Sequence, residues 1–277
     1  MLHCQLGDDG GARRAAHCLS MLLVEKHGSV ARVTLDRPQM RNAFDDALIA
    51  RLTQTFRNLD GDPSVRAVVL AANGPAFCAG ADLNWMKRMA EYDFEQNLAD
   101  ATALAEMLRT LDRLAKPTIA RVHGPVFAGG TGLVAACDIA IGTPEAKVCF
   151  SEARLGLSPA TISPYVMRAI GERAARHYFL SAEVFGAEEA YRIGFLSILT
   201  SPETLDATVE AVLQHLLAAS PQALAKIKDL IRSVAADAID ERLIADTARR
   251  IAEIRASPEG KEGVAAFLEK RKPSWTR

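Results

Sequence analysis

The sequence lacks the features that mark a disulfide scaffold or a binder of polyanions. Its five cysteines include no C-x-x-C pair and form no even framework, so we expect a reducing, cytoplasmic setting. The chain has 33 basic and 34 acidic side chains, a formal net charge of -1, and only short basic runs. Because phosphate backbones are usually bound by a clustered basic surface, we expect no nucleic-acid partner.

Several other motifs are missing as well. No apolar run approaches the ~18 residues of a membrane helix, so we expect no membrane partner. The six histidines show no H-E-x-x-H spacing, and neither a G-x-S-x-G elbow nor a G-x-x-x-x-G-K-S/T phosphate loop occurs. These absences argue against a resident metal, a serine hydrolase and a P-loop enzyme, and we predict no cofactor.

The first twenty residues are set apart from the rest of the chain. Residues 1–20 hold charges but no apolar stretch, which excludes a secretory signal, and Met21 stands directly before a strand pattern. We expect them to be a tag, an over-extended start or a disordered arm. With 49% hydrophobic residues, the chain is long enough for one large core or a core with an appendage.

Apolar periodicity predicts the elements of that core. Residues 21–38 alternate around Gly28 as a β-hairpin, and residues 45–59 follow helical spacing with Asp45 as the cap. Buried strands are predicted at 65–72, 117–122, 138–141 and 147–150, one long helix at 83–115, and further helices from 165 to 267. This order indicates a β-rich α/β body with parallel strands, followed by a helical appendage.

Three glycines lie in "AGGTGLVAACDIA" at 128–140, where Gly130 begins a match to the G-x-G-x-x-G/A fingerprint. A dinucleotide fingerprint directly follows a buried strand in the first βα turn, whereas this one lies in mid-chain, well after the strand at 117–122. The first turn of a helix instead offers free N–H groups to an anion. A transient oxyanion needs a second donor, and the loop "AFCAGADLNWM" at 76–86 is the candidate.

Together the two loops resemble the signature of the crotonase (enoyl-CoA hydratase/isomerase) superfamily, and the match extends over nearly the whole chain after Met21. In that resemblance, "AFCAGADL" gives the first oxyanion-hole N–H at Ala81, and "HGPVFAGGTGLVAACDIAI" gives the second at Gly129. The segment "KVCFSEARLGLSP" carries the catalytic carboxylate at Glu152. "VTLDRPQMRNAF" resembles the first CoA-contacting loop, and "EGKEGVAAFLEKRKPSW" resembles the C-terminal ending.

The resemblance implies a crotonase-like α/β fold, a spiral of repeated ββα units. It implies a core with the active site at 21–215 and a helical oligomerisation region at 216–277, in a homotrimer or a dimer of trimers. The substrate would be an acyl-CoA thioester, so coenzyme A arrives as part of the substrate. The implied substrate-contacting residues are Met40, Arg41, Ala43, Ala79, Ala81, Asp82, Leu83, Asn84, Gly129, Phe267 and Lys270.

One departure from the family pattern concerns Gly132. Family hydratases usually carry two glutamates, and the first belongs at this position, so only Glu152 remains for acid–base chemistry. For hydration, Glu152 would deprotonate the water that attacks C3 and return the proton to C2. For double-bond isomerisation, one base would move a proton between C2 and C4. The residues alone leave both reactions open.

The sequence around the site favours hydration. The stretches "FCAGADLNWMKRMA" and "GLSPATISPYVMRAIGERAARHYFLSAE" resemble bacterial methylglutaconyl-CoA and isohexenylglutaconyl-CoA hydratases of leucine and acyclic-terpene breakdown. We therefore predict a hydratase of this type, with an enoyl-CoA isomerase as the alternative. A crotonase-fold protein that binds CoA esters without turnover is a further alternative of another class, against which the intact Glu152 argues.

Three neighbouring residues have two interpretations each. Asp82 either contacts substrate through its backbone or caps the helix that begins near Leu83. Trp85 and Met86 either line the acyl pocket or belong to the core at helical spacing. A second substrate carboxylate would need a cation, for which Arg88, Arg154 and Arg168 are available.

Overall fold

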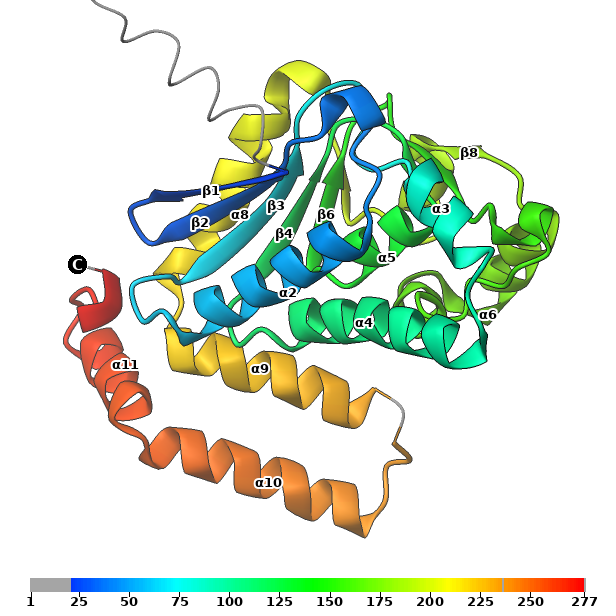
Figure 1. Ribbon diagram of the computed structural model, residues 1–277. Helices are drawn as coiled ribbons and strands as arrows, with labels where there is room; N and C mark the ends of the chain where they lie inside the picture. Colours follow the sequence, from blue (N-terminus) through cyan, green and yellow to red (C-terminus); the bar gives the residue numbers. More distant parts are fainter. Residues whose placement is uncertain (1–20, 236, 277) are drawn as a thin grey trace, which may run out of the picture.

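The computed structural model describes residues 21–235 and 237–276, so the predicted arm at 1–20 lies outside the described residues (Figure 1). The main sheet has the strand order β1-β2-β3-β4-β6-β9. Its strands are β1 (Leu22–His27), β2 (Val30–Leu35), β3 (Ala67–Ala72), β4 (Thr118–Val122), β6 (Ile139–Gly142) and β9 (Ile198–Leu199). β1 and β2 form the predicted antiparallel hairpin, and all later neighbours pair in parallel.

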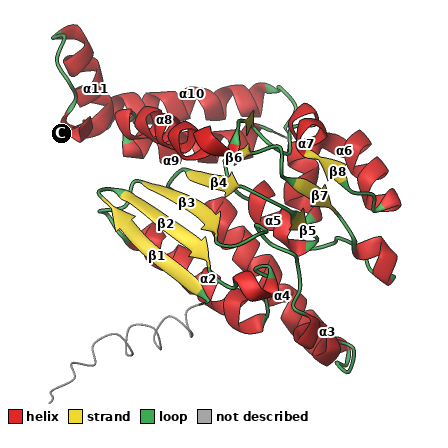
Figure 2. Cartoon of the chain, turned by 90° about the horizontal axis from the view of Figure 1, so that it is seen from above, coloured by secondary structure: helices red, strands yellow, loops and turns green. Residues whose placement is uncertain are grey.

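Helices cover both faces of this sheet. In β3, Val68 and Leu70 join the core that includes the apolar faces of α2 (Asp46–Gly61) and α4 (Phe94–Arg113). Ala67 and Val69 point the other way and pack against α8 (Leu205–Ala218). Figure 2 shows the sheet between α8 and α2. Because both faces are covered, β3 is a continuous apolar run, "AVVLAA", that is buried throughout.

The helix predicted over 83–115 is two helices, α3 (Leu83–Met89) and α4. Asp93 begins α4 with a capping box: its side chain accepts from the Gln96 N–H, and the Gln96 side chain accepts from the Asp93 N–H. These reciprocal bonds satisfy backbone groups at a helix start, so the chain begins a new helix here. Prediction of one long helix was wrong because helical spacing of apolar residues continues across the break.

A smaller sheet lies beside the main one. β5 (Val126–Phe127) pairs in parallel with β7 (Lys147–Cys149), which pairs antiparallel with β8 (Phe185–Gly186). Around it lie α5 (Gly129–Ala135), α6 (Ser163–Ser181) and α7 (Ala187–Arg192) (Figure 2). β5, β8 and β9 escaped prediction because strands of two residues are too short to show alternation.

The remaining helices form a C-terminal arm, α9 (Pro221–Val234), α10 (Glu241–Ala256) and α11 (Pro258–Leu268), which lies beyond the sheet (Figure 1). Arg66, just before β3, donates to the backbone oxygens of Ala219 at 2.6 Å and Trp275 at 2.8 Å, which fastens the end of the chain to the end of α8.

The α/β class with a parallel sheet is confirmed, although helical residues outnumber strand residues, so the body is less β-rich than predicted. In the described part of the chain, no helix is long and apolar enough to cross a membrane.

Candidate active site

β5 brings the three predicted site segments side by side. On one edge it pairs with Cys78, and the Phe127 N–H donates to the Cys78 oxygen at 2.9 Å. On its other edge it pairs with β7, and the Ala128 N–H donates to the Cys149 oxygen at 2.9 Å. The loop at 76–82, the start of α5 and the segment that carries Glu152 are therefore neighbours.

The N–H of Ala81 is free to meet a ligand. Phe44 donates its N–H to the Gly80 oxygen and accepts from the Asp82 N–H, both at 2.9 Å. In this parallel pairing the backbone N–H of the residue between them, Ala81, points away from Phe44. Within residues 21–235 and 237–276 it has no hydrogen-bond acceptor.

The glycines at the start of α5 are required by close packing. A Cβ on Gly129 would lie 2.5 Å from Cζ of Phe44, and one on Gly130 would lie 2.8 Å from Cβ of Cys78. Ala128, just before the helix, holds φ at 46°, an unusual value for a residue with a side chain. The Gly129 N–H, first in the helix, has no acceptor among the described residues. Close packing against Cys78 thus explains the glycine with which the match to the dinucleotide fingerprint begins, Gly130.

Glu152 is the titratable group next to these donors. It begins a short helical turn, Glu152–Leu155, just after β7. Its Oε2 atom is buried and has no hydrogen-bond partner in the described part of the chain. Burial raises the pKa of Glu152, and the opposing effect of its backbone hydrogen bond is smaller. A carboxyl group of this kind can act both as a base and, once protonated, as an acid.

The space beside Gly132, where the resemblance would place a first glutamate, is filled by apolar atoms. A Cβ on Gly132 would lie 2.5 Å from Cγ2 of Ile162 and 3.2 Å from Cδ1 of Leu108. Ile162 and Leu108 are both buried in the main core. Nothing in the sequence pattern around Ile162 indicated this contact, because it joins α5 to residues just before α6.

The loop at 37–45 is locked to the loop at 76–82. Asn42 is fully buried, and its Nδ2 donates to the backbone oxygens of Asn73 at 2.7 Å and Ala76 at 2.8 Å. Arg37 forms ion pairs with Asp45 at 3.1 Å and Asp82 at 3.3 Å. Sequence analysis missed Arg37 and Asn42 as site-building residues, although both lie in the predicted CoA loop "VTLDRPQMRNAF".

The structure shows what the side chains near α3 do, while the predicted contact of the Asp82 backbone with substrate stays a prediction. The Asp82 carboxylate caps α3 by accepting from the N–H groups of Asn84 and Trp85. Trp85 is a buried core residue whose Nε1 donates to Asp100 at 3.1 Å. Arg88 forms an ion pair with Asp46 at 2.7 Å on the exposed surface.

The predicted substrate-contacting residues fall into two groups. One group lies on the loops joined by Phe44 and Asn42, or at the start of α3 and α5; its members are Met40, Arg41, Ala43, Ala79, Ala81, Asp82, Leu83, Asn84 and Gly129. The other group is Phe267 and Lys270, at the end of α11. In Figures 1 and 2, α11 lies far from α3 and α5, so this chain does not bring the two groups together.

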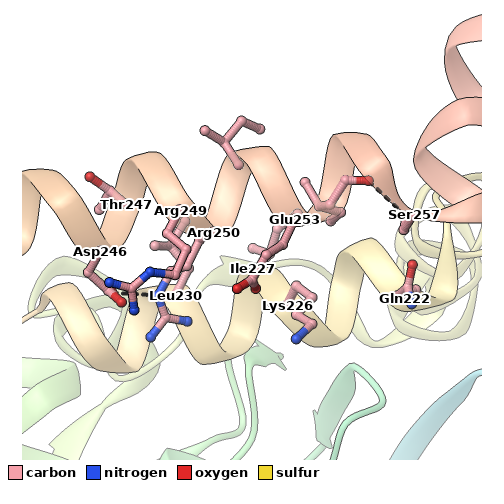
Figure 3. Close-up of a pocket in the computed structure, with 12 residues that line it drawn as sticks. Gln222, Lys226, Ile227, Leu230, Asp246, Thr247, Arg249, Arg250, Glu253 and Ser257 are labelled. Carbon is pink, nitrogen blue, oxygen red and sulfur yellow. Dashed lines mark hydrogen bonds and ion pairs between the residues drawn. The ribbon is translucent and has the colours of Figure 1, made fainter.

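A groove of about 670 Å³ lies elsewhere, between α9 and α10 (Figure 3). Its apolar floor includes Ile227, Leu230 and Ile254, and Arg250 spans it with ion pairs at 2.6 Å to Asp229 and Asp246. None of the predicted site residues lines it. In the described part of the chain, no three His, Cys, Asp or Glu side chains are grouped to hold a metal ion.

Comparison with known proteins matches this geometry to a family. Residues 25–277 match the Enoyl-CoA hydratase/isomerase family. An enoyl-CoA hydratase of Alternaria alternata is 34% identical over 253 residues, which cover 90% of this chain and 82% of the relative. The crystal structure of an enoyl-CoA hydratase from Shewanella pealeana is 45% identical, with a TM-score of 0.91 over 93% of this chain and 96% of that one. That of an enoyl-CoA hydratase from Mycobacterium smegmatis is 36% identical, with a TM-score of 0.87 over 93% and 100%.

Proposed function

The chain belongs to the enoyl-CoA hydratase/isomerase family, and from that premise we propose that it is a hydratase with a single catalytic glutamate. It adds water across the 2,3 double bond of an acyl-CoA thioester, and a branched ester such as 3-methylglutaconyl-CoA is the proposed substrate. The observation that carries the proposal is that β5 lies between the segments that hold these groups. The N–H groups of Ala81 and Gly129 have no acceptor among the described residues, and the neighbouring segment carries Glu152, whose Oε2 atom is buried without a partner there.

The two N–H groups would bind the thioester carbonyl oxygen. When water attacks C3, the electrons of the double bond move onto this oxygen, and the resulting enolate is stabilised by both donors. Removal of one such donor typically costs about 3 kcal/mol of transition-state stabilisation. Because neither donor has an acceptor among residues 21–235 and 237–276, no hydrogen bond within that part of the chain needs to break.

Glu152 would act first as a base and then as an acid. Its carboxylate takes a proton from the attacking water as the C3–O bond forms. It then returns that proton to C2, the electrons of the enolate form the C2–H bond, and the thioester carbonyl is restored. Burial favours the protonated form of Glu152, which makes its carboxylate a stronger base toward the attacking water. Coenzyme A arrives with the substrate, so the proposed chemistry requires no resident metal or cofactor.

One observation favours the isomerase as second candidate. Ile162 and Leu108 fill the space beside Gly132, where the resemblance would place the second carboxylate that orients a water molecule. Isomerisation needs only one base that moves a proton between C2 and C4. The preference for hydration rests on the resemblance of the segments at 77–90 and 156–183 to branched-chain hydratases.

We also propose that the chain forms a homotrimer or a dimer of trimers. Large apolar side chains are exposed along the C-terminal arm: Ile227, Ile231, Ile244, Ile251, Val264, Phe267 and Leu268. Phe267 and Lys270 would then contact coenzyme A in the site of a neighbouring subunit. Light scattering during gel filtration tests this assembly, and a monomer would contradict it. A cytoplasmic location stays a prediction.

The test of the function is the ultraviolet absorbance of the conjugated enoyl thioester. We expect absorbance to fall with crotonyl-CoA and fall faster with 3-methylglutaconyl-CoA. Appearance of conjugation from a 3-enoyl-CoA, without any loss from the other two esters, would favour the isomerase. No change with any of the three esters, despite binding, would leave a CoA-ester binder without catalysis.

A further inference from the structure

Phe44 contacts both segments that carry the proposed oxyanion donors. Through its backbone it makes the two 2.9 Å hydrogen bonds, to Gly80 and from Asp82, that flank Ala81. These bonds fix the direction of the Ala81 N–H, because residues of a parallel pair present alternate backbone groups to opposite sides. The backbone of Phe44 thus sets the first donor.

The ring of Phe44 lies against the second donor residue. Its Cζ would be 2.5 Å, and its Cε2 3.3 Å, from a Cβ on Gly129, so the ring edge rests on the Gly129 Cα. Phe44 is only 1% exposed and cannot move aside into solvent. The ring therefore limits how closely the first turn of α5 approaches the loop at 80–82.

The Phe44 ring also packs against a second aromatic side chain. Trp85 packs against it with ring centroids 6.1 Å apart, and Trp85 is fixed in turn by its hydrogen bond to Asp100 on α4. The next residue along the chain, Asp45, caps α2 by accepting from the Leu48 N–H at 2.9 Å. Phe44 is thus anchored to three helices, α2, α3 and α4, while it touches both donor segments.

We propose that Phe44 is the positioning residue that sets the separation of the Ala81 and Gly129 N–H groups. This inference rests on the proposed function, since it concerns the same two donors. Donors of this kind act only when they lie about 2.7–3.1 Å from the developing oxyanion. A change in the size of the Phe44 side chain would alter that spacing although Phe44 touches no reacting atom.

Two substitutions change the spacing in opposite ways. Phe44→Tyr adds a hydroxyl at Cζ, the atom that faces Gly129, and so forces the segments apart. Phe44→Leu removes the ring edge and lets the first turn of α5 move closer to the loop at 80–82. For both variants we expect kcat to fall on the order of tenfold or more, with KM changed much less, because positioning errors act mainly in the transition state.

A spectroscopic readout separates positioning from general loss of packing. Isotope-edited infrared spectroscopy measures the thioester carbonyl stretch of crotonyl-CoA bound to Glu152→Gln enzyme, where turnover is blocked. Hydrogen bonds from two donors lower the stretching frequency on binding. We expect Phe44→Tyr and Phe44→Leu, each placed in the Glu152→Gln background, to lose a measurable part of that shift.

Phe56→Leu in the same background is the matched control, because Phe56 is a fully buried core phenylalanine on α2. It should lose stability but keep the carbonyl shift. An unchanged shift in both Phe44 variants, or an equal loss in Phe56→Leu, would overturn the role of Phe44 and leave the proposed function intact. No shift with bound ester in Glu152→Gln itself would instead overturn the proposed oxyanion site.

Discussion

Cγ2 of Ile162 lies 2.5 Å from the point that a Cβ on residue 132 would occupy. Real Cβ atoms essentially never come this close to another carbon. With isoleucine at 162 in this position, only glycine fits at 132. The position at which the resemblance places a first glutamate is here packed against apolar side chains. The proposed catalysis therefore relies on Glu152 alone.

Restoring the first glutamate should fail in the present background. We expect Gly132→Glu to lower the free energy of unfolding by about 1–3 kcal/mol or more, since overpacking is combined with burial of a carboxyl group. Adding Ile162→Ala should recover part of that loss, because the clash is with Ile162. Urea denaturation of the two variants measures both effects. Wild-type stability of Gly132→Glu would show that Ile162 does not fill this space.

Stability and activity should depend on pH through Glu152. Its pKa is raised in the folded protein, so the folded state binds more protons than the unfolded state between the two pKa values. Glu152 therefore destabilises the fold as pH rises through that window. Glu152→Gln should be more stable than wild type at neutral pH, and this difference should vanish below the ordinary glutamate pKa.

The acid limb of kcat/KM reports the same group. Because the base form of Glu152 is needed to accept a proton from water, the limb should lie above the usual glutamate range. A limb at or below the ordinary value would contradict the burial of Glu152 in the working enzyme.

The loop that holds Phe44 should depend on Asn42. Its side chain makes three hydrogen bonds, from the Arg37 N–H and to the Asn73 and Ala76 oxygens. Asn42→Ala leaves these partners unsatisfied and should cost about 2–3 kcal/mol. Asn42 also has a φ of 57°, a conformation that glycine adopts without strain. Asn42→Gly is therefore the matched variant, which tolerates this backbone conformation but loses the side-chain hydrogen bonds. If thermal unfolding finds Asn42→Gly as stable as wild type, the hydrogen bonds contribute nothing.

The C-terminal arm is anchored by an ion pair whose loss should be costly. Lys228 on α9 has an 8% exposed side chain and donates to Asp138 at 2.5 Å and to the Lys116 oxygen at 3.1 Å. Asp138→Asn leaves the ammonium group without its counter-charge, and we expect a loss of about 3–5 kcal/mol.

The more exposed pair of Arg121 with Asp206 supplies the control for this anchor. Asp206→Asn should cost under about 1 kcal/mol, because the Asp206 side chain is 66% exposed. Chemical denaturation of the two variants compares them directly. Equal losses would contradict the assignment of Lys228 as a buried anchor.

Much of the fold could be predicted because its elements follow from local patterns in the sequence. The hairpin around Gly28, the helix capped by Asp45 and the buried run of β3 all appear where alternation, spacing and apolar composition placed them. The glycines of α5 were assigned to an anion-binding helix start from their place in the sequence, and the structure adds their steric cause in Phe44 and Cys78.

The remainder depends on contacts between distant residues. The break between α3 and α4 is set by the Asp93 capping box, and β5 is a strand only because Cys78 and β7 flank it. The contact of Ile162 with Gly132 joins residues thirty positions apart, so no local pattern in the sequence predicts it. Phe44 escaped notice for the same reason.

The most direct test of the account is the mass of the product formed from 3-methylglutaconyl-CoA. With wild-type enzyme, mass spectrometry should find a CoA ester heavier by one water molecule. Glu152→Gln should form it slower by roughly 100-fold to 10,000-fold, the usual contribution of a general acid–base group. Water addition that survives in Glu152→Gln at the wild-type rate would contradict catalysis by a single glutamate. A product of unchanged mass would contradict hydration.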